Sequence, residues 1–283
     1  MAIKKYKPTT PGQRNKSGIA FRKLLSGAKR HKPLSKGGKR SVGRNSQGKI
    51  TTRHKGGGHK RVFREIDFYF LDKCDIPAKV DSIEYDPNRS AFISLVCYRD
   101  GERRYVIVPQ SVKVGDEIIT SEKAGLKVGN RTLLSRVPIG AFVYNVELKP
   151  KDGAKIARSA GVSVEIVAID GKHALLKMPS SEIRKVSKNS WATIGEVSNP
   201  EYRLINSGKA GRSRWLGIRP TVRGFAMSAY AHPYGGGEGR TGVGHKRLRT
   251  KWGKPAGKGQ KTRSTKKYSD KLIVERRKIK RKK

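Results

Sequence analysis

The sequence has few of the features that define membrane-spanning, secreted or disulfide-rich proteins. No window approaches the roughly 18 apolar residues that a transmembrane helix needs. The basic stretches are rich in glycine and lack the apolar face of a helix that lies on a membrane. Residues 1–5 carry lysines with no apolar segment behind them, so we expect no secretory signal. Cys74 and Cys97 lie in apolar surroundings without a CxxC pair, which favours reduced core thiols.

Acidic residues are almost absent from both ends of the chain. The net charge is +43, from 65 Lys and Arg against 22 Asp and Glu. Residues 1–64 hold 20 Lys and Arg and no acid, residues 65–205 hold 21 and 19, and residues 206–283 hold 24 and 3. The excess therefore lies in two arms, which are rich in glycine and poor in large apolar residues. Arms of this kind need a polyanion to offset their self-repulsion, and they are typical of a chain that becomes ordered as it binds folded RNA.

The middle of the chain has the short apolar runs of β-strands. Residues 62–71 place Ile66, Phe68 and Phe70 on one face of a period-two pattern, and residues 142–148 alternate as well. Two further pairs of runs flank an Asp-Gly dipeptide, the sequence signal for a hairpin with a type I′ turn: residues 91–98 and 103–108 around Asp100-Gly101, and residues 162–169 and 173–178 around Asp170-Gly171.

One short helix is expected over residues 153–160, ended by Gly161 as its C-cap. Short strands with turn signals about every ten residues otherwise predict a mainly β fold, built from two small antiparallel barrels. The stretch 124–129 is the best place to divide them.

Residues 54–61 form the first candidate site. The segment places His54, Lys55, His59, Lys60 and Arg61 around three glycines (Gly56, Gly57 and Gly58). Glycine lets the backbone approach phosphates closely, while Lys and Arg neutralise their charge. A flexible linker is the plainer alternative. Two histidines without a cysteine argue against a zinc site.

Residues 208–224 form a second candidate site. Five cations surround Trp215 in this stretch: Lys209, Arg212, Arg214, Arg219 and Arg223. Arginine binds phosphates with two parallel hydrogen bonds and stacks on bases, and tryptophan adds a stacking face. Trp215 is equally compatible with a place in a protein core.

Residues 227–240 form a loop, because Gly235, Gly236 and Gly237 soon after a His-Pro pair interrupt both helix and strand. Residues 237–242 match the letters GxGxxG, but no apolar strand precedes them, so we reject a dinucleotide site. His232 follows Ala231, which offers no carboxylate to orient a general base. RNA contact or loop packing is therefore the favoured role of His232.

At this loop the sequence resembles a known family. Residues 219–224, with Ala226, Met227, His232 and residues 235–240, resemble the universal large-subunit ribosomal protein two family in its bacterial form. The resemblance extends through residues 53–61, 66–68, 157–161, 182–186, 195–197, 252–255 and 261–263. Motifs in this order over nearly the whole chain are highly specific.

The resemblance implies an OB-type barrel followed by an SH3-like barrel, with long basic irregular extensions. The expected domains are a basic extension over 1–59, the OB-type barrel over 60–123, the SH3-like barrel over 124–205 and a glycine-rich basic extension over 206–283. The implied function is a primary binder of large-subunit (23S-type) rRNA in the cytoplasm. It would support subunit association, tRNA binding and the architecture around the peptidyl transferase region.

The implied partners are this rRNA and neighbouring ribosomal proteins, with potential contacts to small-subunit rRNA and tRNA. We expect no membrane partner, no homo-oligomer, no catalytic residue, and no cofactor or metal held by the protein. Any Mg²⁺ at the interface is expected to belong mainly to the RNA. Beyond the residues named above, the RNA-binding residues predicted from the motifs are Arg158, Met227, Arg240, Trp252, Lys254, Lys261 and Arg263.

The chain departs from the family at the histidine loop. The family pattern is Asn-Pro-Val-Asp-His-Pro-His, whereas residues 228–234 read Ser-Ala-Tyr-Ala-His-Pro-Tyr. Ala231 replaces the aspartate and Tyr234 the second histidine, so an Asp–His pair cannot form. Two further hypotheses remain open: a peptidyl or acyl transferase centred on His232, and a general protein that condenses DNA or RNA.

Overall fold

The computed structural model describes residues 3–38, 40–239, 242–257, 260, 262–264 and 266–277. The chain forms two compact units. The barrel unit contains the residues up to Arg40, Lys60–Arg212 and the residues from Lys271 on, and the arm unit contains Ser41–His59 and Ser213–Asp270. Both basic arms therefore contribute to the arm unit. No helix in these described residues is long and apolar enough to cross a membrane.

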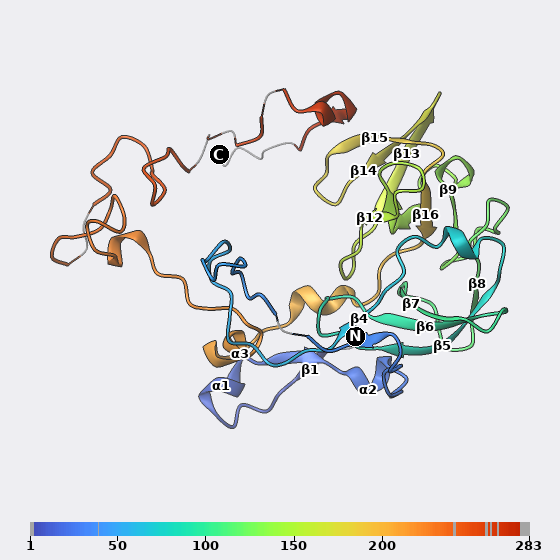
Figure 1. Cartoon of the computed structure of the whole chain (residues 1–283), viewed down its shortest axis with the longest axis horizontal. Helices are drawn as coiled ribbons and strands as arrows, with labels where there is room; N and C mark the ends of the chain where they lie inside the picture. Colours follow the sequence, from blue (N-terminus) through green and yellow to red (C-terminus); the bar gives the residue numbers. More distant parts are fainter. Residues whose placement is uncertain are drawn as a thin grey trace. The chain divides into compact units, whose positions relative to one another are not determined.

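A four-stranded antiparallel sheet builds the first barrel, and the mainly β fold with an OB-type barrel is confirmed (Figure 1). The sheet order is β7-β6-β5-β8. Its strands are β5 (Ala78–Glu84), β6 (Ile93–Tyr98), β7 (Arg103–Ile107) and β8 (Glu117–Ile118). Val80, Val96 and Val106 are buried together in its core. Their β-branched side chains suit a pleated surface that packs on one side.

A seven-stranded antiparallel sheet builds the second barrel, which is SH3-like. The order is β17-β15-β14-β13-β10-β16-β9. Its strands are β9 (Arg131–Leu133), β10 (Phe142–Tyr144), β13 (Val164–Asp170), β14 (His173–Lys177), β15 (Ile183–Ser187), β16 (Trp191–Ile194) and β17 (Ile273–Glu275). A separate pair, β11 (Val146–Glu147) and β12 (Ala154–Ile156), completes this part of the chain.

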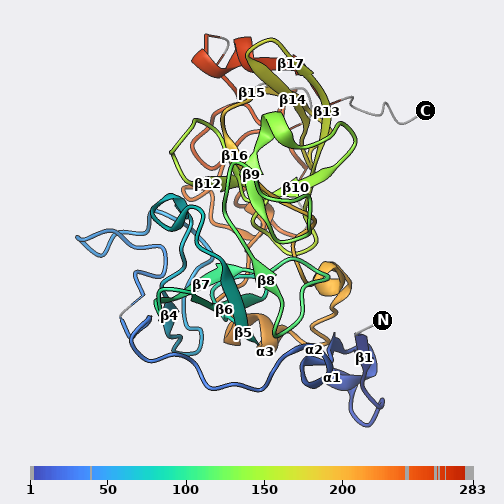
Figure 2. The same cartoon turned by 90° about the vertical axis from the view of Figure 1, so that its right-hand side faces the viewer.

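Strand β17 comes from the basic C-terminal extension, where no strand was predicted. It pairs with β15, through Ile183 opposite Glu275 and Arg184 opposite Ile273, and Figure 2 shows it beside β15 and β14. The only local signal was the β-branched pair Ile273-Val274. Two residues are too few to show a period of two.

Both predicted hairpins are confirmed, but the type I′ turns are wrong. Strands β6 and β7 pair through Cys97 and Arg103, and β13 and β14 pair through Asp170 and His173. A type I′ turn needs a positive φ at both central residues. In each turn the glycine alone has one, 87° at Gly101 and 52° at Gly171, so neither hairpin forms that turn.

The helix expected over residues 153–160 is wrong. Ala154–Ile156 form β12, and Ala157 follows with a φ of 54°, which a right-handed helix does not allow. The carbonyl of Ala157 accepts a hydrogen bond from the N–H of Asn145 at 3.2 Å. Pairing with another part of the chain therefore overrides the helix propensity of this Ala- and Lys-containing stretch.

The strand expected over residues 62–71 is confined to β4 (Phe63–Arg64). The carboxylate of Asp67 accepts the N–H groups of Tyr69 and Phe70, at 2.8 and 3.1 Å, and so turns the chain. The predicted faces are confirmed at the turn, because Phe68 and Phe70 pack against the core while Tyr69 is exposed.

The rest of the described chain contains short helices, strands and 3₁₀ turns. The helices and strands are β1 (Ile3–Lys5), α1 (Pro11–Arg14), β2 (Ser17–Ile19), α2 (Phe21–Leu24), β3 (Ser35–Lys36) and α3 (Ala210–Trp215). The 3₁₀ turns are η1 (Leu71–Lys73), η2 (Leu134–Arg136), η3 (Pro200–Leu204), η4 (Gly224–Ala226) and η5 (Tyr268–Leu272). Strand β1 pairs with β2, and the Lys16 ammonium lies 4.1 Å from the centre of the Tyr6 ring.

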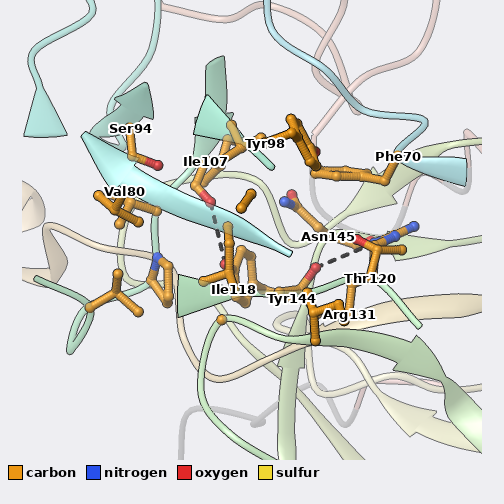
Figure 3. A pocket seen from close by; sticks show the side chains of 18 residues that line it. Phe70, Val80, Ser94, Tyr98, Ile107, Ile118, Thr120, Arg131, Tyr144 and Asn145 are labelled. Carbon is orange, nitrogen blue, oxygen red and sulfur yellow. Dashed lines mark hydrogen bonds between the residues drawn. The ribbon is translucent and has the colours of Figure 1, made fainter. Parts of the chain in front are cut away.

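A buried ion pair between Arg131 and Glu147 lies at the junction of the two barrels, and Figure 3 shows Arg131 beside Asn145. Arg131 Nη2 donates to Glu147 Oε1 at 2.8 Å, and Nη1 donates to the Asn145 carbonyl at 2.8 Å. The guanidinium also lies 4.7 Å from the centre of the Phe70 ring of the first barrel. Burial lowers the pKa of Arg131, and Glu147 opposes that effect. This cluster joins the two barrels through a charge that has no access to water.

The cavity beside this ion pair is no ligand site. It measures about 20 Å³, which is room for about one water molecule. Its lining is mostly apolar, and the Tyr144 hydroxyl donates to the Ile107 carbonyl across it at 3.3 Å (Figure 3). The basic arms are therefore the better candidates for the functional site.

Cys74 and Cys97 are free and only partly buried. The prediction of free thiols is confirmed, but neither thiol is a core residue. Burial raises the pKa of the Cys74 thiol, which disfavours the reactive thiolate.

Candidate nucleic-acid interface

The two basic arms pair with each other inside the arm unit. The N–H of Gly56 donates to the Gly217 carbonyl at 2.9 Å, and the N–H of Arg219 donates to the His54 carbonyl at 3.1 Å. Together these bonds make an antiparallel bridge between Lys55 and Ile218. The two predicted sites, 54–61 and 208–224, are therefore joined in space at residues 54–59 and 215–219.

Gly58 allows this close approach. A Cβ at Gly58 would lie 2.8 Å from the nitrogen and 2.9 Å from the Cα of Gly217, closer than real Cβ atoms come. The backbone is left-handed on both sides of the bridge at Lys55, with φ of 62° at His54 and 64° at Gly57. These glycines are thus needed for the packing of the two arms against each other. Any close contact of their backbone with phosphates would be an additional role.

Trp215 is not a core residue. Its side chain is 50% exposed, and its ring lies 6.0 Å from that of His59. The alternative of a buried structural tryptophan is therefore wrong. An exposed indole within a basic segment is the kind of surface on which bases stack.

A second exposed tryptophan lies at the tip of a small turn. Arg249 bridges to Pro255, and the N–H of Thr250 donates to the Lys254 carbonyl at 2.9 Å. Trp252 between them is 65% exposed, with the Arg53 guanidinium 5.2 Å from its ring centre. This arrangement brings an N-terminal arginine against a C-terminal aromatic ring.

The histidine loop is held together by Tyr234. Its buried ring stacks on Phe225 at 5.2 Å and lies 4.9 Å from the ring of His232. Its hydroxyl accepts a hydrogen bond from the N–H of Arg249. Tyr234 is thus the core of this loop.

His232 is engaged by its own loop. The N–H of Tyr234 donates to His232 Nδ1 at 3.1 Å, so Nδ1 is an acceptor within the loop. This hydrogen bond occupies the Nδ1 lone pair. Gly224 lies against the His232 ring, where a Cβ would come within 2.6 Å of Nδ1.

The glycines after His232 also serve packing. A Cβ at Gly235 would overlap the Ser228 carbonyl, and the N–H of Gly236 donates to the Met227 carbonyl at 3.0 Å. These contacts close the loop on itself. Gly237 is exposed, with a φ of 85°.

The predicted RNA-binding residues fall into two groups. Those of the arm unit are His54, Lys55, Gly56, Gly57, Gly58, His59, Arg214, Trp215, Arg219, Arg223, Met227, His232, Gly235, Gly236, Gly237, Trp252, Lys254 and Arg263. Those of the barrel unit are Lys60, Arg61, Arg158, Lys209 and Arg212. Arg240 and Lys261 lie outside the described residues.

Several of the predicted cations already have protein partners. Arg263 donates to the Asp270 carboxylate at 2.7 Å, and Arg61 donates to the Pro87 carbonyl at 2.8 Å. The Arg158 guanidinium lies 4.7 Å from the Phe68 ring centre. These side chains contribute to protein packing, which leaves fewer of their donors for phosphate.

The arm unit cannot balance its own charge. Its two segments hold 18 Lys and Arg against two acids, Glu238 and Asp270. The described residues contain no cluster of three His, Cys, Asp or Glu that could hold a metal ion. The chemistry of this surface is therefore cationic and hydrogen-bond donating, which suits a polyanion.

Family models match both parts of the chain. Residues 31–120 match the model described as the RNA-binding N-terminal domain of ribosomal proteins L2. Residues 127–253 match the model described as the C-terminal domain of ribosomal proteins L2. The two matches together span both barrels and most of the arm unit.

Proposed function

We propose, from the premise that the chain belongs to the ribosomal protein L2 family, that it is a primary rRNA binder of the bacterial type. Membership itself makes the chain a structural RNA-binding protein of the large ribosomal subunit, in contact with large-subunit rRNA and other ribosomal proteins. Our proposal adds that it supports subunit association, tRNA binding and the architecture around the peptidyl transferase region. It adds a cytoplasmic location as well.

The observation that carries the proposal is the pairing of two basic arms around exposed aromatic rings. Residues 54–59 and 215–219 form one surface with Trp215, and Arg53 brings Trp252 beside it. Cations neutralise phosphates, and aromatic rings stack on unpaired bases. The surface of the arm unit would then supply the rRNA contacts.

We propose that the histidine loop is structural. Ala231 offers no carboxylate to His232, and the Nδ1 that such a carboxylate would orient instead accepts the N–H of Tyr234. The loop is built around the buried Tyr234 ring. Its role is then to hold a shape against RNA, with no proton transfer.

Site-directed crosslinking tests the rRNA contact. The full-length protein should sediment with the large subunit, and photoreactive side chains placed singly within residues 208–263 should crosslink to large-subunit rRNA. The same photoreactive side chains placed on the outer face of β14 should crosslink to this rRNA far less. Sedimentation without crosslinks from 208–263, or equal affinity for unrelated duplex DNA and RNA, would instead favour a general condensing protein.

Substitution of His232 separates the structural from the enzymatic role. Reconstituted large subunits that carry His232→Gln should form peptide bonds within a few-fold of the wild-type rate, because no proton passes through this ring. The rate is measured by single-turnover peptide-bond formation, with assembly and tRNA binding as controls. A loss of about 100-fold or more with both controls intact would support general acid–base catalysis by His232.

A further inference from the structure

A basic cleft lies within the arm unit and is formed by both arms. Its volume is about 520 Å³, within the range of roughly 300–1,000 Å³ found for small-ligand sites. Arg44, Arg53, Lys55 and Arg219 line it, together with the apolar side chains of Val42 and Ile50. Arg219 comes from the C-terminal arm and the others from the N-terminal arm, so the cleft exists only when the arms are paired.

The charge of the cleft is uncompensated. Neither Asp nor Glu lines it, and among the described residues Lys55 and Arg219 make no ion pair. Arg44 uses Nη1 to bond the Gly48 carbonyl at 2.8 Å, which fixes its guanidinium beside the cleft. A phosphate is the anion that a set of Lys and Arg donors is best suited to hold.

One wall of the cleft is backbone without bulky side chains. It contains Gly56 and Gly57, where the chain adopts positive φ of 139° and 64°. The Arg219 side chain lies against this wall, with Cδ 3.6 Å from the point where a Cβ of Gly56 would stand.

Other residues of the lining suit a base. Ile50 is 61% exposed and lines the cleft, so it presents an apolar surface to an occupant. Arg53 lines the same cleft and carries a planar guanidinium that stacks on aromatic rings, as it does on Trp252. A base between Ile50 and Arg53 would thus continue toward the exposed Trp252 ring.

We propose that this cleft holds one unpaired nucleotide of RNA, with its phosphate on Lys55 and Arg219 and its base between Ile50 and Arg53. The inference rests on the proposed rRNA-binding function and adds what this site recognises. Proteins read RNA sequence mainly at unpaired bases turned out of the helix, because the deep major groove of an RNA duplex is too narrow for side chains. An RNA duplex would contact only the cations at the cleft. Its bases are paired, so none of them could enter the cleft and contact Ile50.

A substitution that fills the cleft without changing its charge tests the proposal. Thr52 lines the cleft and is exposed, so Thr52→Tyr should fold normally while occupying the space of the base. Filter binding of the full-length variant to large-subunit rRNA should be about 10-fold weaker or more, the loss of one base contact, with an unchanged dependence on salt. Ser264→Tyr, an exposed position of the same unit outside the cleft, should stay within about 2-fold of wild type.

Photocrosslinking identifies the occupant. With Ile50→p-benzoylphenylalanine, crosslinks should map to one or a few unpaired nucleotides of the rRNA. Crosslinks spread over paired nucleotides, or wild-type affinity of Thr52→Tyr, would each overturn the proposal while rRNA binding persists. Loss of rRNA binding by the wild-type protein would instead overturn the proposed function itself.

Discussion

Raising the salt concentration from 50 to 200 mM is expected to weaken binding of the full-length protein to large-subunit rRNA by about 10³-fold or more. Residues 1–64 carry 20 Lys and Arg without an acid, and residues 206–283 carry 24 against three acids. Each neutralised phosphate releases counterions, so the affinity falls with a log–log slope of about −0.9 per contact on a duplex. A slope magnitude above about 5 corresponds to the expected loss.

Single substitutions test whether cations of the arms cause this salt dependence of rRNA binding. Lys55→Gln should lower the slope magnitude by about one, because it removes one phosphate contact. Lys177→Gln is the matched control, since Lys177 is held on the SH3-like sheet by Glu165 at 2.8 Å. Its slope should equal that of the wild type. An affinity that barely responds to salt would contradict an interface built on phosphate neutralisation.

Glu147→Gln is expected to cost about 3–5 kcal/mol of the free energy of unfolding. The substitution leaves the Arg131 guanidinium charged and unpaired, and Arg131 is only 1% exposed. Glu147 Oε2 also accepts the N–H of Lys151 at 3.0 Å and of Trp191 at 3.3 Å. The carboxylate therefore holds β9, β16 and the loop after β11 together. Urea unfolding with a two-state fit measures the change.

Two variants distinguish the effect of an unpaired buried charge from the effect of the Glu→Gln change itself. Arg131→Met combined with Glu147→Gln should recover at least half of the stability, because no buried charge then remains. The control Glu165→Gln breaks the partly exposed pair with Lys177 by the same chemical change, and should cost less than about 1 kcal/mol. Equal losses for Glu147→Gln and Glu165→Gln would mean that burial at the barrel junction contributes little.

The fold could be predicted from the sequence where neighbouring residues carry the signal. The apolar runs around Asp100-Gly101 and Asp170-Gly171 specify two hairpins, because a strand, a turn and its partner strand adjoin in the chain. The turn type depends on φ at each central residue, which residue letters restrict only weakly. The stretch 153–160 misled the prediction because its partner strand, β11, outweighs its local helix propensity.

The candidate site shows the same division. The basic and glycine-rich composition of residues 54–61 marked them as a candidate site, since charge and glycine act locally. Arg44 was not singled out, and Arg53 was named only within the motif 53–61 that carries the resemblance, although both line the cleft. Their role depends on Arg219, which reaches the cleft only through the pairing of the arms.

The sequence by itself determined that two arms of high positive charge flank a near-neutral β-rich body, because charge and apolar alternation are properties of each segment alone. Only the tertiary structure decided that the arms pair at Lys55 and Ile218, that β17 extends the SH3-like sheet, and that Arg131 meets Glu147 at the barrel junction. The physical reason is common to all three. Each is a contact between segments distant in the chain, and its free energy depends on desolvation and close packing that no local pattern records.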